Sequence, residues 1–264
     1  MNKSRLDIQT IHQFHTAGLL DAAKEGYLAI LEDEPENAEI LLALGILLAQ
    51  QGNFSASVNT LQTAIHYQPR NPALFLNLGN ALKAMGYMVQ AIETYQQAID
   101  LNPDYAAAMN NLGTVYFAQN NITEAIRYYR LAIEKTPDYL DAYYNLGLAL
   151  TKNRQITEAI GIYEKIISYF PQCTAAQFQL GCLYLEINQI PKAIHAFEQV
   201  EKDVPRQFET QSNMATCYLK LGLLHEAKQH YLKALEINPE DTQVLFNLGV
   251  VNMQQGHVDT AIQN

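Results

Sequence analysis

Prolines recur every 34 residues along almost the whole chain, and this spacing limits the possible folds more than any other feature. A compact globular domain has no reason to repeat one residue at a constant interval, whereas stacked structural repeats do. The sequence is therefore predicted to be a tandem array of 34-residue repeats. Seven of the nine prolines form the series Pro35, Pro69, Pro103, Pro137, Pro171, Pro205 and Pro239.

Each repeat is expected to form two helices. In residues 106–139, apolar side chains recur at helical spacing on both sides of the polar break at 119–121. Pro137 cannot continue the second helix, because it lacks an N–H group and its ring clashes with the preceding turn. Gly52, Gly86, Gly222 and Gly256 occupy the same break in other repeats and suit a left-handed helix end. The sequence predicts an all-α protein.

Small residues keep the same period. Glycine stands at 45, 79, 113, 147, 181 and 249, and alanine or serine stands at 23, 57, 91, 125, 159, 193, 227 and 261. We expect Gly113 and Ala125 to lie where the two helices of a hairpin cross, because only small side chains let the backbones approach.

These positions resemble the tetratricopeptide repeat (TPR) family, whose spacing is matched by Leu112, Gly113, Tyr116, Ala125, Tyr129, Ala132 and Pro137. The resemblance implies a right-handed α-α superhelix (a TPR solenoid) with the first helices on its concave side. Where the family motif has tryptophan, this chain has Leu41, Phe75, Met109, Tyr143, Gln177, Gln211 and Leu245.

The period predicts one solenoid domain over residues 1–264, with seven full repeats and a truncated eighth. The first repeat is degenerate, with Ile11 in place of glycine and polar Asp7 and Thr10, as a capping repeat requires. The eighth ends before its second helix is complete, so we expect the N-terminal part of a longer protein. The repeats are 4–37, 38–71, 72–105, 106–139, 140–173, 174–207, 208–241 and the partial 242–264.

A polar residue begins the recurring phrase NLG, and the resemblance places it on the concave wall. An amide both donates and accepts, so a line of amides can bind the backbone of an extended peptide. This resembles the asparagine ladder in the TPR arm of O-GlcNAc transferase. Alternatively, these amides only tie neighbouring first helices. The candidate peptide-binding residues are Asn77, Asn111, Asn145, Gln179, Asn213 and Asn247, with the aromatic residues Phe117, Tyr144, Phe178 and Phe246.

Charge and composition exclude several partner classes. The net charge of −10 disfavours nucleic acid. The inner positions 73, 76, 107, 110, 141 and 144 carry no basic cluster, so a clamp for a chaperone's C-terminal carboxylate is not expected. No apolar run is long enough to span a membrane. Cys173, Cys182 and Cys217 cannot all pair, which favours a reducing compartment, and a cytoplasmic, bacterial protein is expected.

No catalytic, cofactor or metal site is predicted. His225 and His230 imitate a zinc motif, but five residues of helix separate them by about 140°. His12 and His15 are three residues apart and lack a third ligand. The predicted function is a non-catalytic scaffold that binds a partner peptide or segment. Two alternatives remain open: a substrate-recruiting arm of a glycosyltransferase or S-adenosylmethionine methyltransferase beyond residue 264, and end-to-end self-association through the uncapped last repeat.

Overall fold

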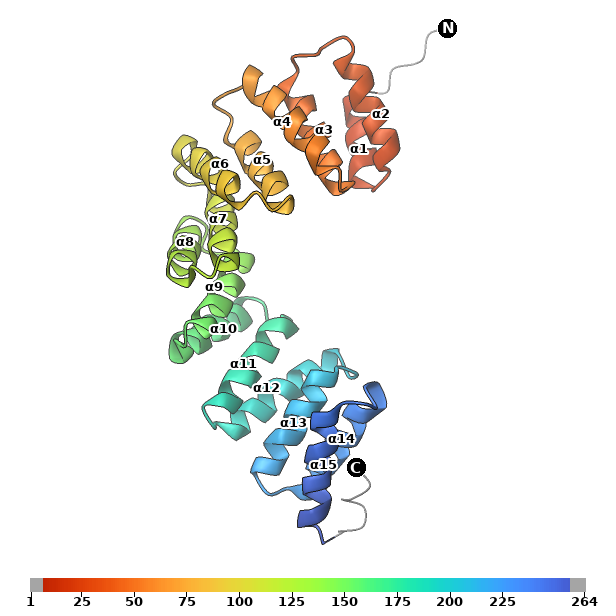
Figure 1. Cartoon of the computed structure of the whole chain (residues 1–264), viewed down its shortest axis with the longest axis vertical. Coiled ribbons are helices and arrows are strands. Elements are labelled where there is room, and N and C mark those ends of the chain that lie inside the picture. Colours follow the sequence, from red (N-terminus) through yellow and green to blue (C-terminus); the bar gives the residue numbers. More distant parts are fainter. Residues whose placement is uncertain (1–6, 257–264) are drawn as a thin grey trace. The chain divides into compact units, whose positions relative to one another are not determined.

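The computed structural model describes residues 7–256, and every regular element among them is an α-helix (Figure 1). The chain divides into two compact units, residues 1–145 and 146–264, which are described separately as unit 1 and unit 2. The expectation of one continuous domain stays a prediction. The second helix of the eighth repeat, with Ala261, and residues 4–6 of the first repeat lie outside the described residues.

The helices follow the 34-residue period as pairs, which confirms the all-α fold. The first helix of every complete repeat after the first begins at that repeat's first residue, as Ala38 and Ala106 illustrate. Unit 1 contains α1 (Ile8–Thr16), α2 (Leu20–Leu31), α3 (Ala38–Gln50), α4 (Phe54–Tyr67), α5 (Pro72–Ala84), α6 (Met88–Leu101), α7 (Ala106–Ala118), α8 (Ile122–Lys135) and the start of α9 (Leu140–Lys152). Unit 2 contains the rest of α9, α10 (Ile156–Tyr169), α11 (Thr174–Glu186), α12 (Ile190–Asp203), α13 (Phe208–Lys220), α14 (Leu224–Ile237) and α15 (Thr242–Gln254).

The turn inside each hairpin has one residue in the left-handed conformation, at the position that the sequence indicated. Gly52, Gly86, Gly222 and Gly256 have φ angles between 73° and 82°. The same position in the three intervening repeats is held by Asn120, Arg154 and Asn188, with φ angles of 60° or 61°. The turn geometry is therefore constant, and side chains other than glycine accept it at a cost of about 1–2 kcal/mol.

The glycine of the NLG phrase is small for a more specific reason than the sequence suggested. The two small positions do lie together, since Ser57 Oγ donates to the carbonyl of Gly45 at 2.7 Å. However, the space that a Cβ on Gly113 would enter is filled by the ring of Tyr129, 2.7 Å away. An aromatic ring of the second helix thus packs directly on the backbone of the first.

In the first repeat the large residue lies on the first helix and the small residue on the second, the reverse of the other repeats. Ile11, at the glycine position, is buried and fills the space beside Gly26. A Cβ on Gly26 would lie 2.7 Å from the Ile11 side chain. Asp7 caps this helix through a 2.8 Å bond from the Thr10 amide to its carboxylate. The degenerate repeat is therefore a closed hairpin with a polar start.

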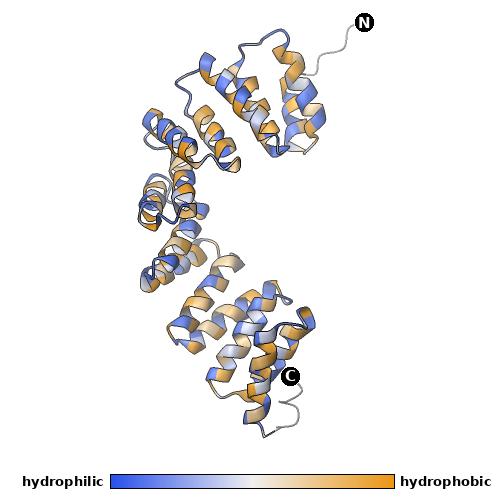
Figure 2. Cartoon of the chain, in the orientation of Figure 1, coloured by the Kyte–Doolittle hydropathy of each residue, from blue (hydrophilic) through white to orange (hydrophobic). Residues whose placement is uncertain are grey.

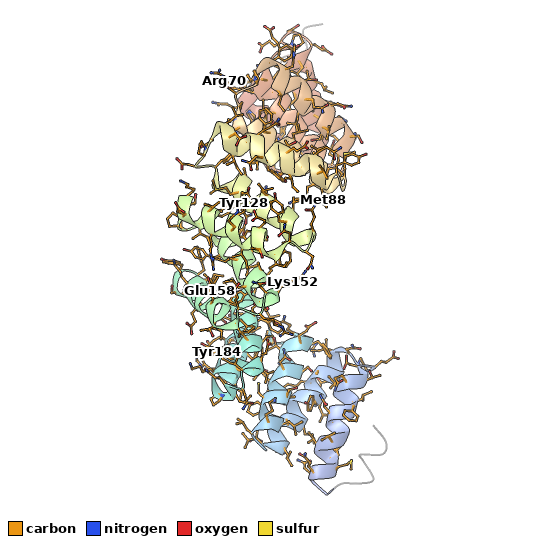
Figure 3. All side chains as sticks on the ribbon, turned by 60° about the vertical axis from the view of Figure 1, so that its left-hand side comes forward. Arg70, Met88, Tyr128, Lys152, Glu158 and Tyr184 are labelled. Atoms are coloured by element: carbon orange, nitrogen blue, oxygen red, sulfur yellow. The ribbon has the colours of Figure 1, made fainter. Side chains whose placement is uncertain are left out.

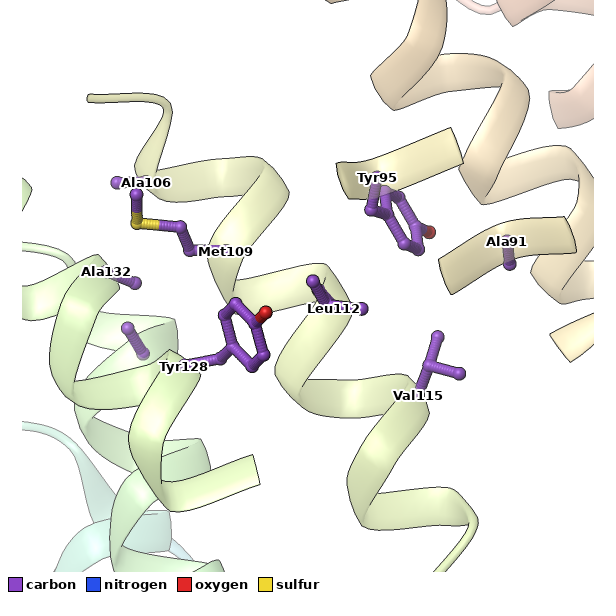
Figure 4. Packing of buried hydrophobic residues seen from close by; sticks show 9 residues of the cluster. Ala91, Tyr95, Ala106, Met109, Leu112, Val115, Tyr128 and Ala132 are labelled. Atoms are coloured by element: carbon purple, nitrogen blue, oxygen red, sulfur yellow. The ribbon is translucent and has the colours of Figure 1, made fainter. Parts of the chain in front are cut away.

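Hydrophobic and hydrophilic residues alternate along the helix ribbons (Figure 2), and most of the buried residues are hydrophobic. In unit 1, Met109 and Leu112 of α7 pack with Tyr128 of α8 and Tyr95 of α6 in one buried cluster (Figure 4). Each repeat thus shares its core with its neighbours, which is how solenoids are stabilised.

Candidate partner-binding surface

First helices of successive repeats lie next to one another within each unit. In unit 1, α3 contacts α5, and α5 contacts α7; in unit 2, α11 contacts α13. Within either unit, no two second helices of the described residues make contacts of that extent. The first helices therefore lie on the inner side of the bend in each unit, and the residues of the NLG phrase are carried by these helices.

Two candidate amides of unit 1 donate to the preceding repeat. The Nδ2 atom of Asn111 donates to Oδ1 of Asn80 at 2.8 Å, and that of Asn145 donates to Oδ1 of Asn110 at 2.9 Å. Asn77 instead donates to the carbonyl of Ala73, one turn earlier in its own helix, at 2.8 Å. All three candidates are half-buried. The structure thus gives Asn111 and Asn145 a tying role between repeats.

Asn80 is a centre of this polar network that the sequence analysis did not identify. Its Oδ1 accepts from both Asn111 and the hydroxyl of Tyr95, the latter at 2.7 Å. Lys83, one turn further along α5, donates to Thr114 of the next repeat at 3.3 Å. Burial lowers the pKa of this lysine. The period could not reveal Asn80 or Lys83, because neither residue recurs at 34-residue intervals.

In unit 2 the amides are less uniform. Asn213 donates to the Cys182 sulfur of the preceding first helix at 3.6 Å, so a thiol replaces the asparagine acceptor. Burial raises the pKa of this thiol to about 11. Asn247 accepts from Gln243 in its own helix at 3.2 Å. Gln179 is half-buried on α11. The three candidate amides of unit 2 thus differ in their hydrogen-bond partners, as do the three of unit 1.

The four candidate aromatic residues differ in exposure. Phe246 is 67% exposed, whereas Phe117, Tyr144 and Phe178 are half-buried. The ring of Phe178 lies 5.8 Å from that of the buried Phe197. Phe246 therefore offers the largest apolar surface of the four, and a binding role for each of them stays a prediction.

The histidines identified in the sequence make hydrogen bonds with other side chains. His12 and His15 both face the hydroxyl of Tyr27, through Nδ1 atoms at 2.9 and 3.1 Å. His225 contacts Gln229 at the surface, whereas His230 is buried. Over residues 7–256, no cluster of three His, Cys, Asp or Glu side chains is arranged to hold a metal ion. Nor does any helix in that range have the length and apolarity needed to cross a bilayer.

A buried polar cluster in the seventh repeat includes His230 and Gln211. Gln211 Nε2 donates to Glu201 at 2.9 Å and to the carbonyl of Pro205 at 3.3 Å. Its Oε1 lies 2.8 Å from Nδ1 of His230, which must carry the proton because Oε1 only accepts. The imidazole also stacks on Tyr218, with ring centroids 5.2 Å apart. These contacts fix the orientation of the His230 ring and place a proton on Nδ1.

Stability of unit 2 should therefore fall in mild acid. Burial, assisted by Lys233 and opposed by Glu201, lowers the folded-state pKa of His230 below its usual 6.5. The unfolded chain then binds a proton more readily, so this contribution is present above pH 6.5 and is lost as the pH falls through the folded pKa. In urea titrations between pH 7.5 and 5.5, the stability difference between the wild type and His230→Phe should shrink. A constant difference would contradict this assignment.

Comparison with protein families gives one description along nearly the whole chain. Tetratricopeptide repeat models match residues 16–60 and 90–139, 72–105, 128–161 and 230–263, 175–206, and 208–241. A further TPR repeat model matches residues 47–86. Comparison with curated proteins gave no significant match.

Solved structures of similar fold are repeat proteins too. YrrB, described as a TPR protein with an unusual peptide-binding site, is 23% identical, has a TM-score of 0.64, and is matched over 70% of this chain and 95% of its own. MamA is 29% identical with a TM-score of 0.55, over 62% of this chain and 94% of its own. The C-terminal part of a TPR repeat-containing protein from Cytophaga hutchinsonii is 15% identical with a TM-score of 0.74, over 90% and 98%.

Proposed function

The chain belongs to the tetratricopeptide repeat family, and we propose that it is a non-catalytic scaffold whose first helices bind an extended segment of a partner protein. The observation that carries this proposal is the line of half-buried amides on adjacent first helices, with Asn77, Asn111 and Asn145 in unit 1. Unit 2 carries its own set of three candidate amides, Gln179, Asn213 and Asn247.

The tying bonds leave capacity for a ligand. A primary amide has two N–H donors and a carbonyl oxygen with two lone pairs, and Asn111 and Asn145 each use one N–H toward the preceding repeat. The same bond fixes the side-chain rotamer, which lowers the entropy that binding would cost. Tying and peptide binding are therefore compatible, and the first prepares the second. The shared fold with YrrB, described as having a peptide-binding site, supports this proposal.

A random peptide library displayed on phage tests the function directly. We expect selection to yield extended peptides that bind the purified chain with micromolar affinity. Changing Asn111, Asn145 and Asn213 together to alanine should weaken binding by at least about tenfold, since each bond contributes about 0.5–1.5 kcal/mol. Isothermal titration calorimetry gives the affinities, and circular dichroism shows whether the helices persist.

Asn110→Ala is the matched control for the tying role. Asn110 is 4% exposed and accepts the bond from Asn145, so its truncation cuts a tie but keeps all six candidate amides. If the amides contact peptide, this variant should bind almost normally while the triple variant does not. Equal losses would mean that the amides only tie repeats. Failure to select any peptide would contradict the scaffold proposal itself.

The other functional hypotheses concern residues outside the described structure. A recruiting role for an attached enzyme depends on sequence beyond residue 264, and self-association through the last repeat depends on residues 257–264.

Single alanine variants in the same titration test the four candidate aromatic contacts, Phe117, Tyr144, Phe178 and Phe246. Among these, Phe246→Ala should weaken binding most, because its ring has the most accessible surface.

A further inference from the structure

A pocket of about 400 Å³ lies in unit 2 between α10, α11 and α12. Its walls are mainly apolar and include Ile167, Leu180, Tyr184 and Pro191, and Lys192 also lines it. Gln177 lines the pocket as well, on the same helix as the candidate amide Gln179. Two residues of helix separate their directions by about 200°, so the pocket opens on a different face from the amide line.

Gln177 has an acceptor that no other group uses. The side chain is 8% exposed, and its Nε2 atom donates to the carbonyl of Pro171 at 2.8 Å. Because that carbonyl can only accept, the orientation of the amide is fixed. Oε1 is buried and has no hydrogen-bond partner. An unpaired buried acceptor destabilises the free protein, so a donor that reached it would gain a hydrogen bond without breaking an existing one.

The next repeat fills the equivalent space with its own side chain. Gln211 and His230 stand 34 residues after Gln177 and Ala196, and the His230 imidazole donates to Gln211. The same imidazole stacks on Tyr218, the equivalent of Tyr184, at an interplanar angle of 17°. Ala196 has only a methyl group at this place, so the sixth repeat has the acceptor and the tyrosine without the ring between them.

A third repeat shows that a ring here is a recurring arrangement. In residues 106–139 the equivalent positions are Tyr116 and Tyr128, which stack with centroids 5.5 Å apart and an interplanar angle of 11°. Tyr128 and Tyr184 are both labelled in Figure 3, on α8 and α11. Two contacts hold the Tyr184 ring in place. The Tyr184 hydroxyl donates to Glu164 at 2.5 Å, and Nζ of Lys192 lies 5.2 Å from the centroid of the ring.

We propose that this pocket binds an aromatic side chain of a partner protein, one that carries an N–H or O–H donor. The ring would stack on Tyr184 as His230 stacks on Tyr218, and its donor would bond Oε1 of Gln177. Tryptophan, tyrosine and histidine side chains meet both conditions, whereas phenylalanine meets only the first. The site is independent of the amide line, so either proposal can fail alone.

Side-chain analogues test the chemistry by saturation-transfer NMR on the whole chain. 3-Methylindole is expected to bind with a dissociation constant of about 1 mM, and toluene, which lacks a donor, about threefold to tenfold more weakly. Gln177→Met should remove this preference. Ala196→His, which copies the seventh repeat, should abolish binding of both compounds while raising thermal stability. Ala196→Tyr copies the fourth repeat and serves as the second filling variant if histidine disturbs the fold.

The source of the ring is tested with peptides. A short acetylated peptide with one tryptophan should bind at least as tightly as 3-methylindole and compete with it, whereas its phenylalanine analogue should be weaker. Binding of the free ring without binding of the peptide would overturn the proposal of a protein partner. Absence of saturable ring binding to the wild type, or unchanged binding to a filled variant that retains its helical spectrum, would overturn the site.

Discussion

Replacing Phe197 with alanine is expected to lower the free energy of unfolding of unit 2 by about 3–5 kcal/mol. Its ring is fully buried on α12 and lies directly over Gly181 of α11, where an added Cβ would come within 2.6 Å of it. Truncation leaves a cavity at the centre of the hairpin, because the glycine opposite has no side chain to fill the space. Urea unfolding followed by far-ultraviolet circular dichroism measures the change.

Phe178→Ala is the matched control for this loss. Phe178 touches the same ring at 5.8 Å between centroids but is half-buried, so its removal costs less packing. We expect about 1 kcal/mol or less from this variant, in line with a partly exposed aromatic pair. Similar losses for both variants would contradict the assignment of Phe197 as the central ring of the hairpin.

Adding a side chain on the opposite helix should be almost as damaging. Gly181→Val is expected to destabilise unit 2 by about 2–3 kcal/mol, because its methyl groups would overlap the buried ring of Phe197. Intrinsic helix propensity contributes little, since valine and glycine differ by only a few tenths of a kcal/mol. The same urea titration measures this change.

Gly161→Val separates the steric cost from any general effect of valine. Gly161 lies in the middle of α10, and apart from its chain neighbours and the backbone of its own helix no atom lies within 4 Å of a Cβ added there. Its stability should remain within about 0.5 kcal/mol of the wild type. In the double variant Gly181→Val with Phe197→Ala, the loss of unfolding free energy should be smaller than the sum of the two single losses, because the valine partly fills the cavity. Strict additivity would show that the two residues do not share one space.

The period alone was enough to predict the helix pairs and their turns. A 34-residue spacing with proline after the second helix left little choice of fold, and the left-handed turn was visible wherever glycine occupied it. The turn at Arg154 was not visible, since nothing about arginine indicates a positive φ angle. The sequence-based explanation for the recurring glycine at Gly113 was also incomplete. The space beside this glycine is filled by the ring of Tyr129, which comes from a different helix.

The candidate site was less predictable than the fold. The period located the amide donors, but the acceptors lie 31 residues before Asn111 and 35 before Asn145. These offsets depend on how neighbouring helices are rotated, which sequence spacing does not specify. The pocket beside Gln177 has the same origin, because it depends on the small size of Ala196 on another helix. Comparing equivalent positions across repeats could have suggested it.

The contacts between neighbouring repeats also bear on how such a gene can change in length. The donors and acceptors that join first helices lie within adjacent repeats, and each hairpin closes its own ring-on-glycine packing. A duplication of 34 codons would therefore add one complete repeat, and a deletion of 34 codons would remove one. In both cases the flanking repeats would still pack against repeats of the same kind. An insertion whose length is not a multiple of 34 would instead put extra residues inside one hairpin or its connection, where they have no place in the repeated packing.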